Sequence, residues 1–446
     1  MRSERGRPRP EERSALIDAP SPPPLPSSSR RRGDSLESEK RVTRLSAPPH
    51  ECHGQCYGFE KERADWPVAR LTYSSSAPAR PGYASRTASE YQDEPSVLRA
   101  KVECLARLLR ESSRSVVYAG AGLSTAAGIP DYATSRRGGD AAIQAQGEGT
   151  YRSPTCAQPT QAHRVLVGLY HAGLLYRVIQ QNHDGLPQKA GMPQHVVNEI
   201  HGSIHSPDNP VVPMSGDLRE DLFQDLLRCE QTADLTIAVG TSLCGMNADR
   251  VVSTPAGKAP KQALGSVVIS LQRTVLDDSS TLRIFAQCDQ VFEMLAQVLA
   301  LDAVPRPHTK GNFFCPPVLR CPPESAYMLT NLPYDSFGQR LESLIEKELL
   351  VLDVRENARI VIPSGPFAGA TGEVDGFDRE GNPRCRFMVR LKKTGKLKVP
   401  HVMLLGSWWL QAAADGTARQ LPVVNWPRNG DHSPAALKLR ALCEAY

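Results

Sequence analysis

Glycine and hydroxyl residues form the first segment whose types and spacing suit chemistry on a nucleotide. Gly120-Ala121-Gly122 follows the apolar run 115–118 and precedes Ser124, where we expect a helix to begin. Glycines let backbone N–H groups approach a pyrophosphate, and a helix N-terminus favours its negative charge. Thr125 stands where the usual dinucleotide fingerprint has its third glycine. By itself, the loop therefore predicts a bound phosphate and nothing more specific.

Two further segments place amide, acid and imidazole groups next to glycines. Asn182 and Asp184 precede Gly185, and His201 precedes Gly202. An imidazole is suited to accept a proton because its unperturbed pKa lies near working pH. Asparagine and aspartate beside glycine more often form turns, and a single histidine is more often structural than catalytic. Residue types alone therefore leave both interpretations open.

Five blocks taken together resemble the signatures of the sirtuin family and follow one another in the family order. They are GAGLSTAAGIPDY at 120–132, QNHDGL at 181–186, EIHG at 199–202, GTSL at 240–243 and SLQ at 270–272. The flanking segments PTQAH and HAGLL are most similar to the nuclear class IV sirtuins. The resemblance implies an α/β fold with a Rossmann-like parallel sheet, helices on both faces and a reduced small domain.

The resemblance also implies an enzyme that uses NAD as co-substrate. The implied activity is that of an NAD-dependent protein-lysine deacylase (deacetylase), which releases nicotinamide and forms O-acyl-ADP-ribose. His201 is the implied general base, and Asn182 and Asp184 would hold the nicotinamide. His183 occupies the variable position of its block and receives no role. The implied catalytic and NAD-contacting residues are His201, Gly120, Ala121, Gly122, Ser124, Ile129, Pro130, Asp131, Tyr132, Gln181, Asn182, Asp184, Gly240, Thr241, Ser242, Ser270, Leu271, Gln272 and Cys288.

The chain departs from the family pattern at the zinc module. The family carries two cysteine pairs after the block that holds the general base, whereas no cysteine occurs here between Gly202 and Cys229. Structural zinc requires four such ligands, so we predict no zinc of the family type. The pairs formed by Cys52-His53 with Cys56, and by Cys315 with Cys321, are too incomplete to predict another metal site.

Other departures lie beside the cofactor and the substrate. Ala133 replaces the arginine that helps to organise the family's NAD loop. The segment that pairs with the acyl-lysine peptide is altered to Met214–Asp217, although Val211–Gly216 is still expected to lie against an extended peptide. These changes leave three alternatives to a deacylase open. They are a catalytically weak NAD- or ADP-ribose-binding protein, a mono-ADP-ribosyltransferase, and a nucleic-acid- or ribosome-associated binding protein that acts through its C-terminal part.

That C-terminal part, residues 340–446, consists of short apolar runs separated by glycine and Asp/Asn turns. Ile360–Gly369 with Gly372-Glu373-Val374 resembles the KOW motif, which implies an SH3-like β-barrel. The lysine-rich segment 392–398 would suit phosphates of a nucleic acid, or a ribosomal or chromatin partner, although such a hairpin tip is more often simply solvated. Trp408-Trp409 are expected in the core.

Apolar periodicity predicts the elements that must position these residues. Helical spacing marks 95–113, 163–175, 219–233 and 288–302, and short apolar runs mark strands at 115–118, 178–179, 235–239 and 267–271. Strands that alternate with helices predict a parallel sheet covered on both faces.

Composition divides the chain into four parts. We expect a disordered basic tail rich in Pro, Ser and Arg at 1–94, a sirtuin-like NAD-binding domain at 95–303, a linker at 304–339 and the β-barrel at 340–446. The start has no apolar signal segment, and no run approaches the ~18 apolar residues of a membrane helix. We therefore expect no membrane partner and a nuclear or cytoplasmic protein, with the nucleus slightly favoured. The Arg30–Arg32 cluster is compatible with a nuclear address or a nucleic-acid contact, although such a cluster is more often a solvated basic tail.

Overall fold

The computed structural model describes residues 52–80, 83–131, 155–213, 216–301, 327–342, 349–390, 398–427 and 430–446. All of them belong to one compact unit, Val42–Tyr446. No helix in these ranges is long and apolar enough to cross a membrane.

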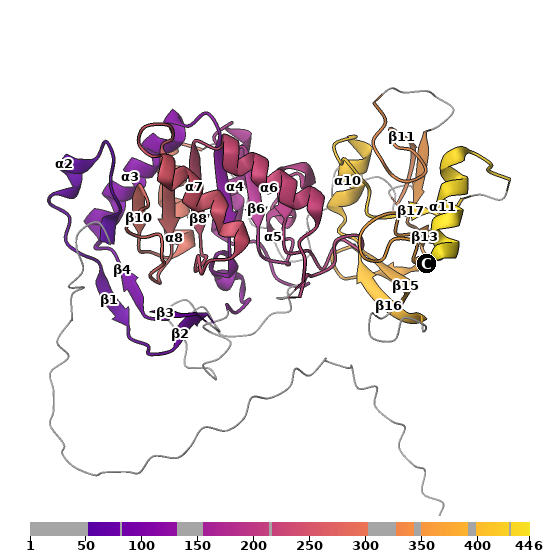
Figure 1. Cartoon of the computed structure of the whole chain (residues 1–446), viewed down its shortest axis with the longest axis horizontal. Helices are drawn as coiled ribbons and strands as arrows, with labels where there is room; N and C mark the ends of the chain where they lie inside the picture. The colour runs from indigo at the N-terminus through magenta and orange to yellow at the C-terminus, as the bar shows by residue number, and fades with distance from the viewer. Residues whose placement is uncertain are drawn as a thin grey trace, which may run out of the picture. The chain divides into compact units, whose positions relative to one another are not determined.

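A six-stranded parallel sheet forms the centre of the first half, as the alternation of strands and helices predicts (Figure 1). Its strand order is β10-β9-β8-β5-β6-β7. Register places Val117 beside both Ile237 and Val178. The strands are β5 (Ser115–Ala119), β6 (Arg177–Gln180), β7 (Val197–Glu199), β8 (Leu235–Val239), β9 (Gly265–Ile269) and β10 (Leu282–Ile284).

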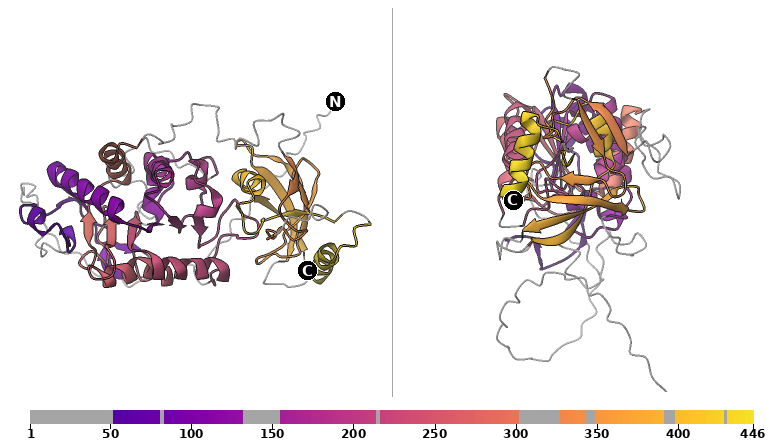
Figure 2. Two further views of the ribbon diagram at one scale, coloured as in Figure 1. Left: turned by 90° about the horizontal axis from the view of Figure 1, so that it is seen from above. Right: turned by 90° about the vertical axis from the view of Figure 1, so that its right-hand side faces the viewer.

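Helices cover both faces of this sheet (Figure 2). On one face Val117 and Ala119 pack in a core with α3 (Pro95–Glu111), α4 (Gln161–His171) and α8 (Cys288–Leu299). On the other face Val116 and Tyr118 pack with α6 (Glu220–Thr232) and α7 (Arg250–Lys258). Successive residues of a strand point to opposite faces, so Val116–Ala119 of β5 are buried and contribute to the cores on both faces. The predicted Rossmann-like architecture is confirmed.

Ordered structure begins well before the boundary expected at residue 94. The segment contains α2 (Glu60–Arg63), β1 (Arg70–Tyr73), β2 (Pro78–Arg80), β3 (Tyr83–Thr87) and β4 (Glu90–Gln92). Cys56 N–H donates to Thr281 O at 2.7 Å, and Tyr91 N–H donates to Leu271 O at 2.9 Å. The expectation of a disordered tail is therefore wrong for the described residues 52–80 and 83–94. These bonds join positions far apart in sequence, which local composition does not reveal.

The C-terminal module, residues 327–446, is an antiparallel β structure. Its five-stranded sheet has the order β16-β15-β14-β13-β17, and β11 pairs with β12. Side chains of β15 alternate between buried and exposed, with Cys385, Phe387 and Val389 inward. The bounds are β11 (Met328–Leu332), β12 (Leu350–Asp353), β13 (Arg359–Val361), β14 (Thr371–Phe377), β15 (Pro383–Arg390), β16 (Lys398–Leu404), α10 (Trp408–Ala414), β17 (Val424–Asn425) and α11 (Pro434–Ala445).

The expected boundary of this module at 340 is too late, because β11 at 328–332 already pairs with β12. The strands and turns expected from the KOW-like motif are present: Gly365 and Gly369 adopt φ of +80° and +90° in the connection between β13 and β14. Such angles favour glycine, since it lacks a Cβ. The SH3-like topology itself stays a prediction, and the lysine-rich tip at 392–397 lies outside the described residues.

Candidate functional site

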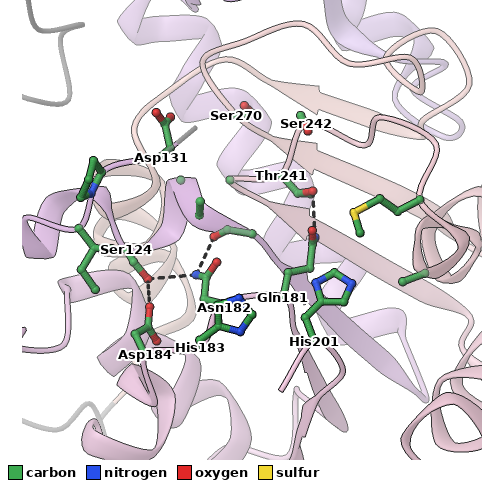
Figure 3. A pocket seen from close by; sticks show the side chains of 18 of the residues that line it. Ser124, Asp131, Gln181, Asn182, His183, Asp184, His201, Thr241, Ser242 and Ser270 are labelled. Carbon is green, nitrogen blue, oxygen red and sulfur yellow. Dashed lines mark hydrogen bonds between the residues drawn. The ribbon is translucent and has the colours of Figure 1, made fainter. Parts of the chain in front are cut away.

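A pocket of about 800 Å³ opens where the parallel strands end (Figure 3). Open α/β sheets bind ligands at this edge, because the loops after several strands meet there. Every described residue of the predicted set lines this pocket, and Tyr132 lies outside the described residues. These residues are Gly120, Ala121, Gly122, Ser124, Ile129, Pro130, Asp131, Gln181, Asn182, Asp184, His201, Gly240, Thr241, Ser242, Ser270, Leu271, Gln272 and Cys288.

The glycines of the first loop serve a different purpose from the one expected. Gly120 N–H donates to Val239 O at 2.9 Å, and Gly122 N–H donates to Gly240 O at 2.8 Å. A Cβ on Gly120 would lie 2.7 Å from Gly240 O. The glycines therefore let the loops after β5 and β8 lie in backbone contact, and their N–H groups are bonded within the protein.

The helix expected at Ser124 is also absent from this position. Residues here form two 3-10 turns, η1 (Ala121–Leu123) and η2 (Thr125–Ala127). The α-helix that begins at the pocket is α8, whose first residue Cys288 lines it. A helix N-terminus carries partial positive charge, so α8 provides the favourable end for a pyrophosphate.

Ser124, Asn182 and Asp184 form one hydrogen-bonded group in the pocket (Figure 3). Ser124 Oγ donates to Asp184 Oδ2 at 2.7 Å, and Asn182 Nδ2 donates to Ser124 Oγ at 3.1 Å and to Gly120 O at 2.9 Å. The carboxylate of Asp184 also accepts from Gln180 Nε2 at 3.1 Å and from Leu186 N at 3.0 Å. Burial raises the pKa of Asp184, and the hydrogen bonds from Leu186 N and Ser124 Oγ oppose the rise. The group fixes the Asn182 amide at the pocket wall.

His201 reaches the pocket from the loop that follows β7. Its carbonyl accepts from Val212 N at 2.9 Å, which anchors the segment 211–213 beside it. His183 Nδ1 lies 3.0 Å from the carbonyl oxygen of Gly202. Gln181, on the next wall, donates to Thr241 Oγ1 at 2.9 Å and so joins the loops after β6 and β8. The pocket thus carries an amide and a carboxyl from the loop after β6 and an imidazole from the loop after β7.

Several pocket residues escaped the sequence prediction. Glu90 of β4 lines the pocket and forms an antiparallel bridge with Gln272. Its segment was assigned to the tail, and no local signal marks it. His183 also lines the pocket, although its variable position suggested no role. Ile204, Met246 and Asn247 complete the walls from loops whose composition is unremarkable.

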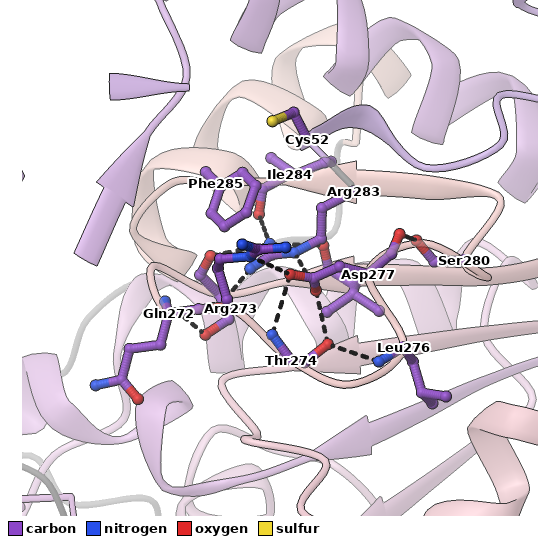
Figure 4. A network of polar contacts seen from close by, with 12 residues as sticks. Cys52, Gln272, Arg273, Thr274, Leu276, Asp277, Ser280, Arg283, Ile284 and Phe285 are labelled. Atoms are coloured by element: carbon purple, nitrogen blue, oxygen red, sulfur yellow. Dashed lines mark hydrogen bonds and ion pairs between the residues drawn. The ribbon is translucent and has the colours of Figure 1, made fainter. Parts of the chain in front are cut away.

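A buried arginine positions the wall at 270–272 (Figure 4). Arg283 of β10 has no exposed surface, and its guanidinium forms an ion pair with Asp277 at 2.6 Å. It also donates to the carbonyls of Ser270, at 3.0 Å, and of Gln272. Asp277 in turn accepts from Thr274 Oγ1 at 2.6 Å. This network ties the loop after β9 to the neighbouring strand, and the sequence analysis missed it.

Metal-ligating side chains do not gather within the described ranges. No group of three or more His, Cys, Asp or Glu side chains there is placed to hold an ion. Cys56 Sγ donates instead to His53 O at 3.2 Å. The absence of a family-type zinc stays a prediction. Ala133, Met214, Ser215, Cys315 and Cys321 lie outside the described residues.

Comparisons with known proteins match this chain to Sir2-type proteins. The sequence profile described as "Sir2 family" matches residues 148–209. "NAD-dependent protein deacetylase sirtuin-7" of Bos taurus is 27% identical over 269 residues, which cover 50% of this chain and 65% of that protein. A solved structure, Sir2Tm bound to a propionylated peptide, is 24% identical over 45% of this chain and all of that chain, at a TM-score of 0.38, too low to bear on the fold.

A bacterial relative is matched over a larger share of its own length. "NAD-dependent protein deacetylase" of Cutibacterium acnes is 31% identical over 193 residues, which cover 32% of this chain and 78% of that protein. This match agrees with the five signature blocks, which the fold brings to one pocket at the end of a parallel sheet. The chain therefore belongs to the Sir2 family, the sirtuins.

Proposed function

We propose that this protein is an NAD-dependent protein-lysine deacylase. The observation that carries the proposal is the meeting of Asn182, Asp184 and His201 in one pocket with the glycine loop of a Sir2-family chain. The pocket volume, about 800 Å³, lies within the usual range for cofactor sites. Bound NAD would supply the ribose carbon that takes up the acyl-lysine oxygen as nicotinamide leaves.

Residues on the loops after β5, β6 and β7 would bind the nicotinamide half of NAD and accept the proton. Asn182, fixed by Ser124 and by Gly120 O, would present its amide to the nicotinamide, with Ile129, Pro130 and Asp131 alongside. Gln181 would contact the nicotinamide ribose. His201 would accept a proton from a ribose hydroxyl, which suits an imidazole near neutral pH.

The far side of the pocket suits the rest of the dinucleotide. The N-terminus of α8 at Cys288 would face the pyrophosphate, because it carries partial positive charge. Gly240–Ser242 and Ser270–Gln272, which directly follow β8 and β9, would contact the adenosine half. No role in this proposal requires a zinc ion.

The second substrate would be an acyl-lysine protein or peptide, with histones as one candidate class. Val211, Val212, Pro213 and Gly216 line the pocket beside His201 and would lie against an extended peptide. The chain spans 65% of the bovine relative, so activity and substrates of that whole protein are carried here only as part of the proposal. A nuclear location is proposed on the class IV resemblance and the Arg30–Arg32 cluster.

The test is nicotinamide release by the full chain from NAD and an acetyl-lysine peptide. We expect release by the wild type, and a loss of about 100-fold or more in His201→Gln, because a general base typically contributes that much. His195→Gln is the matched control, since His195 is exposed and lies outside the pocket lining. Its rate should equal that of the wild type.

Other outcomes select the alternatives. NAD binding without release, over several acyl groups, would identify a weak NAD- or ADP-ribose-binding protein. ADP-ribose joined covalently to a protein acceptor would identify a mono-ADP-ribosyltransferase. Salt-sensitive RNA binding with neither reaction would identify a nucleic-acid-binding protein that acts through the C-terminal module.

A further inference from the structure

The C-terminal module touches the back of both segments that carry the reactive side chains. Trp408, the first residue of α10, is buried, and its indole lies on Gly185: a Cβ there would come 2.7 Å from the ring atom Cη2. Gly185 directly follows Asp184 and adopts φ of +65° at the start of α5 (Leu186–Lys189). Any other residue at 185 would meet both backbone strain and the indole.

The loop after His201 receives a second set of contacts. Gly406 N–H donates to His205 O at 2.9 Å, and Trp409 Nε1 donates to Ser206 Oγ at 2.9 Å. The His205 imidazole packs edge-on against the Trp408 indole, with ring centroids 4.9 Å apart. One short loop thus carries His201 into the pocket and binds the C-terminal module four to five residues later.

The two pocket segments are also bonded to each other. Ile204 N–H donates to His183 O at 3.1 Å, and His183 Nδ1 lies 3.0 Å from Gly202 O. A displacement of either segment therefore moves the other. Trp408 contacts both of them, Gly185 on one and His205 on the other.

A buried ion pair closes the junction. Lys189 Nζ lies 2.7 Å from Glu380 Oε2, and the two side chains are only 7% and 9% exposed. Lys189 also donates to Thr155 O at 3.0 Å, and Glu380 accepts from Gln158 Nε2 at 3.3 Å. Separating a buried pair leaves uncompensated charge, which is strongly unfavourable. The junction is therefore a specific, built interface.

We propose that the C-terminal module is part of the catalytic unit, with Trp408 and Trp409 as positioning residues for the Asn182–Asp184 and His201 segments. The inference rests on the proposed function. Apart from the Gln158–Glu380 hydrogen bond, these contacts fall on residues 185–206, whereas the glycine loop and the Ser270 segment are held by β5, β8 and Arg283. Loss of the indoles should therefore slow turnover and leave NAD binding nearly intact.

The test uses full-length Trp408→Ala beside Trp426→Ala, which removes an indole from the same module where it packs with Arg359 and Val424. We expect Trp408→Ala to lower kcat for nicotinamide release by about tenfold or more, because small displacements of reacting groups are costly. The Kd for NAD should change less than about threefold, and Trp408→Phe should recover most of kcat. Equal losses in Trp408→Ala and Trp426→Ala, or no loss in either, would overturn the proposal.

Two smaller substitutions distinguish a positioning role from a general loss of folding. Trp409→Phe and Ser206→Ala each remove one partner of the same hydrogen bond. If the bond positions the loop, each lowers kcat by a similar factor and the double variant is no slower than either single one. Multiplying losses would show that the two side chains act independently and would contradict the proposal.

Hydrogen exchange, which does not depend on enzymatic activity, tests this inference separately from the proposed function. If the wild type releases no nicotinamide, the proposed function fails by itself. Hydrogen exchange at the amides of Ile204 and Val212 should still be faster in Trp408→Ala than in Trp426→Ala, because both amides are bonded within the braced loop. Identical exchange in the two variants would overturn the positioning role.

Discussion

The residue type at several pocket positions follows from the protein atoms that contact the position, as well as from any ligand it would bind. Gly120 and Gly122 are small because Gly240 lies against them, and Asp184 is a buried acceptor for several donors before it is a contact for a ligand. A signature motif therefore contains positions that build the pocket as well as positions that would touch substrate.

Replacement of Asp184 tests this structural role. Asp184→Ala would leave Ser124 Oγ, Gln180 Nε2 and Leu186 N without their acceptor, and each unsatisfied buried group costs about 1–3 kcal/mol. We expect the free energy of unfolding in urea to fall by about 3 kcal/mol. Asp184→Asn keeps an acceptor oxygen and should lose about half as much. Equal stability of the alanine and asparagine variants would contradict this account.

At the scale of elements, loops at the sheet edge are held by residues on neighbouring strands. The Ser270–Gln272 wall follows β9, but Arg283 on β10 bonds its carbonyls. The N-terminal β4 adds Glu90 beside the same wall. The 270–272 wall of the pocket is therefore held in place by the packing of this edge of the sheet.

Arg283→Met is the corresponding prediction. Methionine has similar length but no donors, so Asp277 would keep a buried charge without its guanidinium, at a cost of about 3–5 kcal/mol. We expect reduced stability by urea unfolding together with a raised Kd for NAD. Arg283→Lys keeps the charge and should restore part of both. A methionine variant with wild-type stability would rule out this role.

For the whole molecule, buried histidines predict how stability depends on pH. Burial, aided by nearby cations, lowers the pKa of His53, His163 and His205 to about 3. Their unfolded pKa is near 6.5, so the unfolded chain binds more protons between these values. Stability is therefore fully present above pH 6.5 and falls as the pH falls, by up to about 1.4 kcal/mol per pH unit for each histidine.

His205→Phe tests the contribution of one histidine to the pH dependence of stability. Neither ring nitrogen of His205 has a hydrogen-bond partner among the described residues, so the substitution removes no side-chain hydrogen bond. Between pH 6.5 and 5, urea unfolding of this variant should depend on pH less steeply than that of the wild type, by up to about 1.4 kcal/mol per unit. His401→Gln, at an exposed position of β16, should keep the wild-type slope. Parallel slopes for His205→Phe and the wild type would contradict the prediction.

Local sequence predicted two kinds of element: helices with apolar residues at helical spacing over many residues, and strands that are buried on both faces of the sheet. Leu235–Val239 is the strand β8 as expected, and the helical spacing from Pro95 onward became α3. The three-residue edge strands β7 and β10 were not predicted, because their pairing is decided by neighbours across the sheet. The N-terminal boundary was missed for the same reason: Lys101 and Asp93 form a fully buried pair, which also holds Cys52 O.

The sequence by itself determined the family, the parallel sheet and the signature residues that line part of the pocket, because signature order and apolar period are properties of the chain. Tertiary structure alone decided how the glycines are used, that α8 and not residue 124 begins a helix at the pocket, that Glu90 lines the pocket, and that Arg283 bonds the carbonyls of its 270–272 wall. It alone also placed Trp408 on Gly185. These facts depend on contacts between residues far apart in the chain, and such contacts leave no periodic trace in sequence.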